Sequence, residues 1–75
     1  MNTGWVLRFT LQDEYIMYAA IDGTDLLDSG NLQLCDKKYA TTLTRHQAEA
    51  WQTFLTNNQR FVVAFGVQIV SIEPT

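Results

Sequence analysis

The stretch TTLTRHQAEAWQTFLTNN, residues 41–58, is the part of this sequence in which local chemistry most clearly predicts a structure. Thr44 is followed three residues later by Gln47, the spacing of a capping box, in which each side chain bonds a backbone amide of the first helical turn. At about 100° per residue, the apolar side chains that follow fall within one broad arc. They are Ala48, Ala50, Trp51, Phe54 and Leu55. Asn57 and Asn58 tolerate the left-handed conformation found at many helix ends, so we predict an amphipathic helix that ends at these asparagines.

Four other segments carry the alternation or the apolar content of strands. They are WVLRFTL (5–11), YIMYAAI (15–21), LQLC (32–35) and RFVVAFGVQIVSIEP (60–74). A short polar turn separates the first two segments, which predicts an antiparallel hairpin. In the last segment we interpret Gly66 as a bulge or a bend. The side chains that alternate onto one side of this segment are Phe61, Val63, Phe65, Val67 and Ile69.

This order of segments predicts an α+β fold that the whole chain, residues 1–75, forms as a single domain. Three strands precede the helix and one follows it, so the arrangement is β-β-β-α-β with an antiparallel sheet of about four strands. We expect the helix to pack on one face of this sheet. Its seat is the apolar stripe of the first strand, formed by Trp5, Leu7, Phe9 and Leu11.

One helix covers only one face of such a sheet, and several strands are apolar on both sides. The residues expected on the uncovered face are Val6, Ile16, Tyr18, Ala20, Val70 and Ile72. Either sheet curvature or the loop at 22–31 covers this face, or the face binds a partner, since monomers rarely expose a large apolar area. A chain of this size also gains core by association. We therefore predict a homodimer, with contributions from Ile16, Tyr18, Val70 and Ile72.

Composition limits the classes of function. The 75 residues carry a formal net charge of -3 and include a single cysteine, Cys35. An acidic chain lacks the excess of Lys and Arg with which proteins bind nucleic-acid phosphates, and one cysteine cannot form an intrachain disulfide. The first residues lack a basic segment before an apolar run, and no apolar run reaches the roughly 20 residues of a membrane helix. We expect a soluble protein of a reducing cytoplasm.

Few residues are candidates for catalysis or metal binding. Nucleophilic catalysis needs a nucleophile, an adjacent base and a group that orients the base. His46 lies near the start of the predicted helix on its solvent side, and Cys35 ends a short strand. Asp22, Asp25 and Asp28 are three residues apart, whereas calcium loops place oxygen ligands on alternate residues and close with a Glu. We therefore predict no enzymatic activity, no metal and no cofactor.

Two kinds of macromolecular partner remain. The acidic run of Asp22, Asp25 and Asp28 can engage a basic surface on a protein, including one that normally holds nucleic acid; carboxylates of a solvated turn are the alternative. Single-stranded nucleic acid is the less favoured partner, because no basic groove accompanies the aromatic side chains that would stack on bases. These aromatic residues are Trp5, Tyr15, Tyr18, Tyr39 and Trp51. We therefore predict a protein partner.

The overall pattern resembles that of small accessory proteins encoded by phages and prophages. The resemblance lies in a first strand that begins with Trp, a hairpin, LTRHQAEAW as a capped helix and VQIVSIEP as the closing strand. Some proteins of this kind, anti-CRISPR proteins among them, inhibit bacterial defence systems by occluding a binding site or forcing oligomerisation. The resemblance implies a stoichiometric inhibitor that binds a host defence complex in the bacterial cytoplasm. It carries over no functional residue, and a small structural or housekeeping oligomer without an inhibitory role is the alternative.

Overall fold

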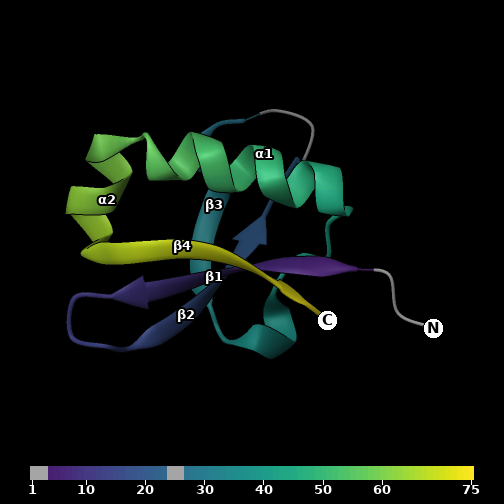
Figure 1. Ribbon diagram of the computed structural model, residues 1–75, viewed down its shortest axis with the longest axis horizontal. Coiled ribbons are helices and arrows are strands. Elements are labelled where there is room, and N and C mark those ends of the chain that lie inside the picture. Colours follow the sequence, from purple (N-terminus) through teal and green to yellow (C-terminus); the bar gives the residue numbers. More distant parts are fainter. Residues whose placement is uncertain (1–3, 24–26) are drawn as a thin grey trace.

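The computed structural model describes residues 4–23 and 27–75 (Figure 1). Within these residues the chain forms a four-stranded sheet, two α-helices and two short 3-10 helices. The strands are β1 (Trp5–Leu11), β2 (Ile16–Ile21), β3 (Leu32–Cys35) and β4 (Val67–Pro74). The helices are η1 (Ser29–Asn31), η2 (Lys37–Tyr39), α1 (Arg45–Thr56) and α2 (Gln59–Phe65).

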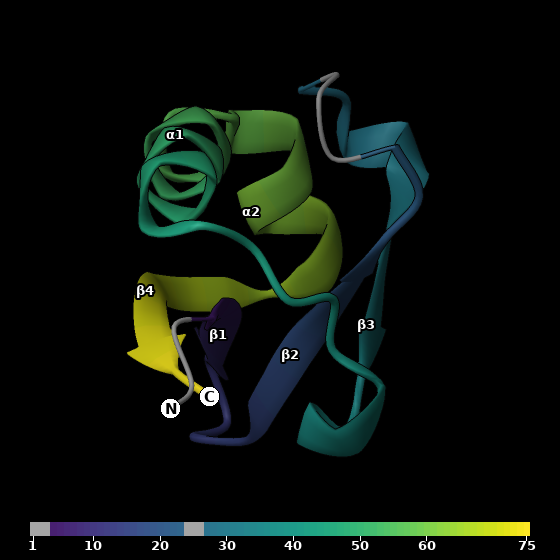
Figure 2. The same cartoon turned by 90° about the vertical axis from the view of Figure 1, so that its right-hand side faces the viewer.

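The strands form one antiparallel sheet in the order β3-β2-β1-β4. Both α-helices lie on the same side of this sheet, with α1 and α2 joined almost directly (Figure 2). The predicted α+β class with an antiparallel four-stranded sheet is therefore confirmed. The element order differs by one helix, because α2 lies between α1 and β4 where a continuous strand was expected.

The helix predicted within residues 41–58 is present as α1. The side-chain oxygen of Thr44 accepts a hydrogen bond from the Gln47 amide at 3.1 Å, and Gln47 Oε1 accepts one from the Thr44 amide at 3.0 Å. The capping box is therefore formed as predicted. The helix buries three side chains against the sheet, Ala48, Trp51 and Leu55.

The core lies between the two helices and one face of the sheet. Leu7 and Phe9 are fully buried within it, and Trp5 and Leu11 pack against it as partly buried side chains. The guanidinium of Arg45 lies 5.0 Å from the centroid of the Trp5 ring and covers it from the solvent side. The stripe predicted as the seat of the helix is therefore confirmed.

The prediction of one strand over residues 60–74 is wrong in its first half. Residues Gln59–Phe65 form α2 instead. Asn58 caps this helix, since its side-chain oxygen accepts a hydrogen bond from the Phe61 amide at 3.2 Å. Gly66, with a φ of 62°, ends it in the left-handed region that favours glycine. The strand β4 begins directly after this glycine.

The apolar alternation that predicted a strand has a helical explanation. Phe61 is buried, and the centroid of its ring lies 5.5 Å from that of Phe9 and 5.1 Å from that of Phe65. Phe61 and Phe65 are neighbours because side chains four residues apart share one face of a helix. Val63, between them in sequence, points the other way and is 75% exposed.

The predicted left-handed exit of α1 is also wrong. Asn57 has right-handed helical backbone angles, φ -91° and ψ -1°. Asn58 is extended, as an N-cap residue must be, because it begins the next helix rather than ending the last. The two asparagines therefore form a tight junction between α1 and α2.

A bulge decides which side chains of β4 face the core. The pairing register with β1 shifts between Val67 and Ile69, so Gln68 is the extra residue. Beyond the bulge, Val70 and Ile72 pair with the core residues of β1 and lie on the helix-covered face together with Val67. The prediction that Val70 and Ile72 lie on the uncovered face is therefore wrong, and Ile69 takes that side instead.

The outer edge of β4 is partly occupied by a side chain of α1. The Thr75 amide donates to the Gly4 carbonyl at 3.0 Å, and hydrogen-bonded pairs alternate along an antiparallel ladder. The backbone groups of Val70 and Ile72 therefore point away from β1. Gln52 Nε2 donates a hydrogen bond to the Val70 carbonyl oxygen at 3.0 Å. This half-buried glutamine thus fills one outward-facing acceptor of the edge strand.

The connection from β3 to α1 crosses from one face of the sheet to the other. It begins with η2 on the face away from α1 and α2 (Figure 2). The Thr41 amide then donates to the Ala19 carbonyl at 2.9 Å, and the Thr41 hydroxyl accepts from the Ile21 amide at 2.7 Å. Leu43 forms a bridge with Trp5 at the start of β1. The segment therefore fills the space where β1 and β2 separate.

Candidate functional site

The most exposed of the large apolar side chains in the described residues lies on α2. Val63 is 75% exposed and Phe65 is 44% exposed. Phe65 lies on the side of Phe61, whereas Val63 and its neighbour Ala64 lie on the opposite side and form a surface that we call the α2 patch. Val63 and Ala64 line a shallow, mostly apolar hollow with Arg60. The patch faces solvent because the opposite face of the helix carries Phe61 into the core.

Charged residues lie near both ends of α2. Arg60, in the first turn of α2, is exposed and borders the α2 patch. At the C-terminal end of α2, the Gln12 amide donates to the Gly66 carbonyl at 2.8 Å and holds the turn between β1 and β2 against the helix. Asp13 of that turn lines a second shallow hollow with Phe65. Figure 1 shows α2 and this turn at the same end of the molecule.

The face of the sheet away from the helices carries a charged cluster centred on Glu73. Lys37 Nζ lies 2.6 Å from one carboxylate oxygen of Glu73, and Arg8 Nη1 lies 3.8 Å from the other. The Tyr18 hydroxyl donates to the same carboxylate at 3.2 Å. The hydrogen bond between Lys37 and Glu73 lowers the pKa of the Glu73 carboxyl and raises the pKa of the Lys37 ammonium. The cluster thereby joins η2 to β1, β2 and β4.

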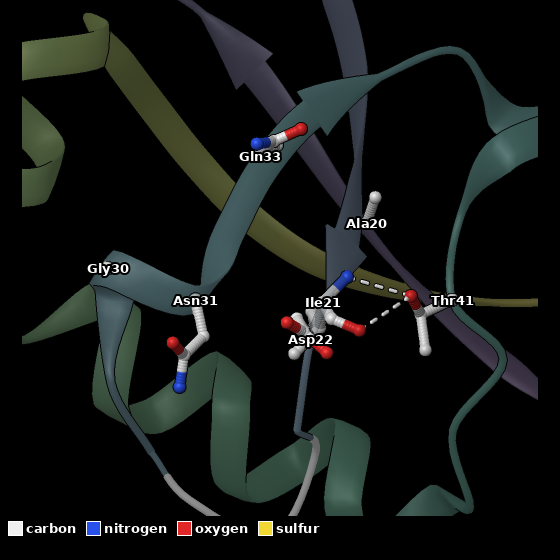
Figure 3. Close-up of a pocket in the computed structure, with 7 residues that line it drawn as sticks. All are labelled: Ala20, Ile21, Asp22, Gly30, Asn31, Gln33 and Thr41. Atoms are coloured by element: carbon white, nitrogen blue, oxygen red, sulfur yellow. Dashed lines mark hydrogen bonds between the residues drawn. The ribbon is translucent and has the colours of Figure 1, made fainter.

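A polar pocket lies where β2 and β3 approach η1 (Figure 3). It is lined by Ala20, Ile21, Asp22, Gly30, Asn31, Gln33 and Thr41. The Thr41 hydroxyl accepts from the Ile21 amide at 2.7 Å and donates to the Ile21 carbonyl at 3.3 Å, so it is engaged in the fold. The remaining polar side chains of the pocket can hold water or a small polar group. They include no nucleophile beside a base, which nucleophilic catalysis requires.

The acidic residues predicted to contact a partner are only partly described. Asp22 and Asp28 are both exposed, and Asp22 lines the polar pocket. Asp28 Oδ1 accepts a hydrogen bond from the Gly30 amide at 2.9 Å, which is the turn role considered as the alternative. Asp25 lies outside the described residues. Asp22 and Asp28 lie beyond the end of β2 that is farther from the α2 patch.

His46 and Cys35 lie on opposite sides of the sheet. His46 is exposed at the second position of α1. Cys35 pairs across the ladder with Tyr18 on the face away from the helices. Burial, and to a lesser extent Asp36, raises the pKa of the Cys35 thiol, which disfavours the reactive thiolate. Within residues 4–23 and 27–75, no group of three His, Cys, Asp or Glu side chains is placed to hold a metal ion.

The residues predicted for self-association do not share one surface. Ile16 and Tyr18 lie on the face away from the helices, where Tyr18 bonds Glu73. Val70 and Ile72 lie on the opposite face, Val70 within the core and Ile72 packed against it. No single twofold contact of that face can therefore use all four side chains. The homodimer itself stays a prediction.

The aromatic side chains considered for stacking on nucleic-acid bases are divided. Trp51 is fully buried, and Trp5 packs against the core beneath Arg45. Tyr15 and Tyr39 are 62% and 64% exposed. The two tryptophans are therefore committed to the fold, whereas Tyr15 and Tyr39 remain on the surface.

Our sequence reasoning missed the α2 patch, because an alternating strand would have turned Val63 and Phe65 toward the core together with Phe61. Two signals for a short helix were present. Asn58 is a favoured N-cap residue, and Gly66 stands where a helix of two turns would end. A strand with those two residues at its ends is less consistent with local chemistry than a helix is.

The chain matches no family model, and no curated protein or solved structure is significantly similar to it. Among the described residues, neither α-helix has the length and apolar character needed to cross a membrane. The candidate site is therefore defined by its own geometry alone.

Proposed function

We propose that this chain is a non-catalytic binding protein that acts by protein–protein contact through the α2 patch. The observation that carries the proposal is the 75% exposure of Val63 on a helix whose opposite face is buried in the core through Phe61. Exposed apolar side chains bordered by an arginine, as Val63 and Ala64 are by Arg60, are the kind of surface that protein interfaces use.

The fold does not account for the exposure of the α2 patch. Phe61 attaches α2 to the core, and Asn58 and Gly66 define its two ends. Val63 has no part in either role, and a β-branched residue is a slightly unfavourable choice for an exposed helical position. A contact that buries Val63 gives this position a physical reason.

A photo-crosslinking experiment in the producing cell tests the proposal without assuming which protein binds. The photoreactive residue p-benzoylphenylalanine replaces Val63 in one variant. In a matched control it replaces Thr53, an exposed position on α1. We expect a discrete crosslinked protein product from the Val63 variant and none from the control. The absence of a product, or the same product from both variants, would overturn the proposal.

The more specific form of the proposal is an inhibitor of a bacterial defence system, present in the host cytoplasm. Asp22 and Asp28 support it, because they are exposed carboxylates at the end of β2 away from the α2 patch, and a negative surface suits a basic nucleic-acid channel. The alternative is a small oligomer without an inhibitory role.

Co-purification with a defence nuclease complex separates these two forms. We expect wild type to remain bound to the complex and the double variant Asp22→Lys, Asp28→Lys to be released from it. The difference between wild type and the double variant should be larger at low salt, since exposed charge contacts weaken as ionic strength rises. Wild-type protein that copurifies with no such complex would exclude the inhibitor role while leaving the contact at the α2 patch open.

A further inference from the structure

We propose that the face of the sheet away from the helices binds an acidic segment of a partner protein, and that Arg8 on this face receives a carboxylate of that segment. The helices, and with them the α2 patch, lie on the other side of the sheet (Figure 2). Arg8 therefore offers a second contact surface, beyond the one in the proposed function, for a partner that is recognised by its negative charge.

Arg8 lies in the middle of this face. It belongs to β1, an inner strand of the sheet, where the ladder pairs it with Tyr18 of β2 and with Ser71 of β4. Its side chain is nevertheless 42% exposed. A cationic side chain therefore reaches solvent at the centre of the sheet rather than at its rim.

The described residues leave the guanidinium of Arg8 poorly satisfied. Its Nη1 lies 3.8 Å from Glu73 Oε1, which is too far for a hydrogen bond. Its Nε has no acceptor within the part of the chain that the structure describes. Arginine donates two parallel hydrogen bonds to the two oxygens of a carboxylate. A carboxylate from another molecule therefore uses donors that this fold leaves open.

Glu73 does not fill this role, because other groups hold its carboxylate. Lys37 Nζ lies 2.6 Å from Glu73 Oε2, and the Tyr18 hydroxyl donates to the same oxygen at 3.2 Å. The hydrogen bond with Lys37 is the main cause that lowers the pKa of the Glu73 carboxyl, and the charge of Arg8 is the smallest cause. The contact between Arg8 and Glu73 is thus the one in this cluster that an incoming carboxylate can replace.

The cluster around Glu73 carries an excess of positive charge. It holds two cations, Arg8 and Lys37, and one carboxylate, so one positive charge is in excess, although the chain as a whole carries a net charge of -3. One excess charge is complementary to one carboxylate. It falls short of the several Lys and Arg side chains with which proteins bind the phosphates of a nucleic acid. The charge therefore favours an acidic protein segment over a nucleic acid.

An apolar row next to Arg8 indicates what accompanies the carboxylate. Thr10 lies two residues along β1 and pairs with Ile16 on one side and with Ile69 on the other. Ile69 is 54% exposed. Side chains two residues apart in an extended segment point to the same side, as those of Arg8 and Thr10 do. An extended segment that contacts both places therefore carries Asp or Glu and, two residues away, an apolar side chain that packs on Ile69.

Selection from a random peptide library displayed on phage, with the full chain as the immobilised target, provides the test. We expect the enriched sequences to share an Asp or Glu with an apolar residue two positions away. Fluorescence anisotropy then measures the affinity of one enriched peptide for wild type and variants. Arg8→Gln should weaken binding about tenfold, since it removes hydrogen bonds to a charged group. Arg45→Gln, which removes an equal charge from an exposed position of α1, should leave the affinity unchanged.

Two further variants separate binding from a general effect on the fold. Arg8→Lys keeps the charge but loses the paired donors of the guanidinium, so it should lose part of the affinity. Glu73→Gln removes the carboxylate that opposes Arg8 and Lys37, so we expect the peptide to bind severalfold more tightly. A change that only loosened the sheet would weaken binding instead. Circular dichroism checks that each variant is folded.

Three outcomes overturn the inference. The first is a selection that enriches no peptide, or only peptides without the acidic residue. The second is an affinity of Arg8→Gln and Arg8→Lys equal to that of Arg45→Gln. The third is weaker binding by folded Glu73→Gln. The crosslink at Val63 tests the other side of the sheet, so the contact at the α2 patch stands or fails independently of these outcomes.

Discussion

The two α-helices of this protein lie side by side in sequence, yet only one of them follows from its local pattern. α1 has twelve residues, a complete capping box and three buried side chains one helical repeat apart. α2 has seven residues, a single cap contact and one buried side chain, and its FVVAF segment is rich in residues that favour strands. The first is specified by local chemistry, and the second by its two ends together with the core.

The difference shows how a short helix can form from residues that favour strands. A helix of two turns is too short to be stable alone. Phe61 supplies the missing stability by packing against Phe9. The Asn58 cap and the left-handed Gly66 then restrict where the helix begins and ends. The comparison therefore predicts that α2 depends on a few positions, and those positions can be tested.

The largest effects are expected at the buried aromatic residue of each helix. Trp51→Ala and Phe61→Ala should each lower the free energy of unfolding by about 3–5 kcal/mol, since both leave a large cavity. Val63→Ala should change it by less than about 0.5 kcal/mol, because Val63 is exposed. Urea unfolding followed by circular dichroism measures all three. A Val63→Ala change as costly as Phe61→Ala would instead fit an alternating strand, which turns both side chains toward the core, and would break the comparison.

Gly66 distinguishes a helix end from a strand interior. Its φ of 62° costs any other L-residue about 1–2 kcal/mol, so Gly66→Ala should destabilise the protein by roughly that amount. Crowding adds little, since the nearest heavy atom to an added Cβ is Gln12 Cγ at 3.8 Å. Gly66→Asn is the matched control, because asparagine tolerates this conformation better. In a regular strand, Gly66→Ala would instead be neutral or stabilising.

The two cap residues offer the most direct comparison of the helices. Thr44→Ala and Asn58→Ala should each cost about 1 kcal/mol through the loss of one bond to a first-turn amide. Thr53→Ala, at an exposed position within α1, controls for the general effect of alanine. Thermal or urea unfolding measures the differences. If Asn58→Ala lowered the free energy of unfolding no more than Thr53→Ala does, the cap would not be needed for α2.

On the face of the sheet away from the helices, the contribution of Glu73 to stability should depend on pH. The bond to Lys37 depresses the pKa of Glu73 from its ordinary value of 4.5, so its contribution to stability is present above that value. The contribution is lost as the pH falls through the lower pKa of the folded state. Glu73→Gln should therefore lower the urea midpoint near neutral pH, and the difference from wild type should shrink in acid.

This effect should also be independent of the helices. Glu73 contacts η2 and the sheet rather than α1 or α2. Its change should add to that of Asn58→Ala within the error expected for separate sites. A double variant that departs clearly from the sum would show that the two faces are coupled through the sheet.

The sequence predicted those elements whose signals are local. The bounds of β1 and β3, most of β2 and the cap of α1 follow from alternation and from Thr44 with Gln47. β4 was misassigned in two ways, since α2 removed its first half and the bulge at Gln68 changed the side of Val70. An inserted residue of this kind reverses every later side chain of a strand, and no local propensity reveals it. The candidate site was missed because it lies on the segment that was read as a strand.

The hydrogen bond from Gln52 to the Val70 carbonyl links the docking of α1 to protection against aggregation. An edge strand with open backbone groups is a template for the addition of another chain, and most of β4 is uncharged. While α1 is undocked, the outward carbonyl of Val70 is available to a neighbouring molecule. When α1 packs against the sheet, Gln52 binds the Val70 carbonyl oxygen, so this acceptor is no longer available to a neighbouring molecule. Loss of the Gln52 amide would therefore appear as fibre or aggregate formation during refolding at high concentration, even where the folded protein is scarcely less stable.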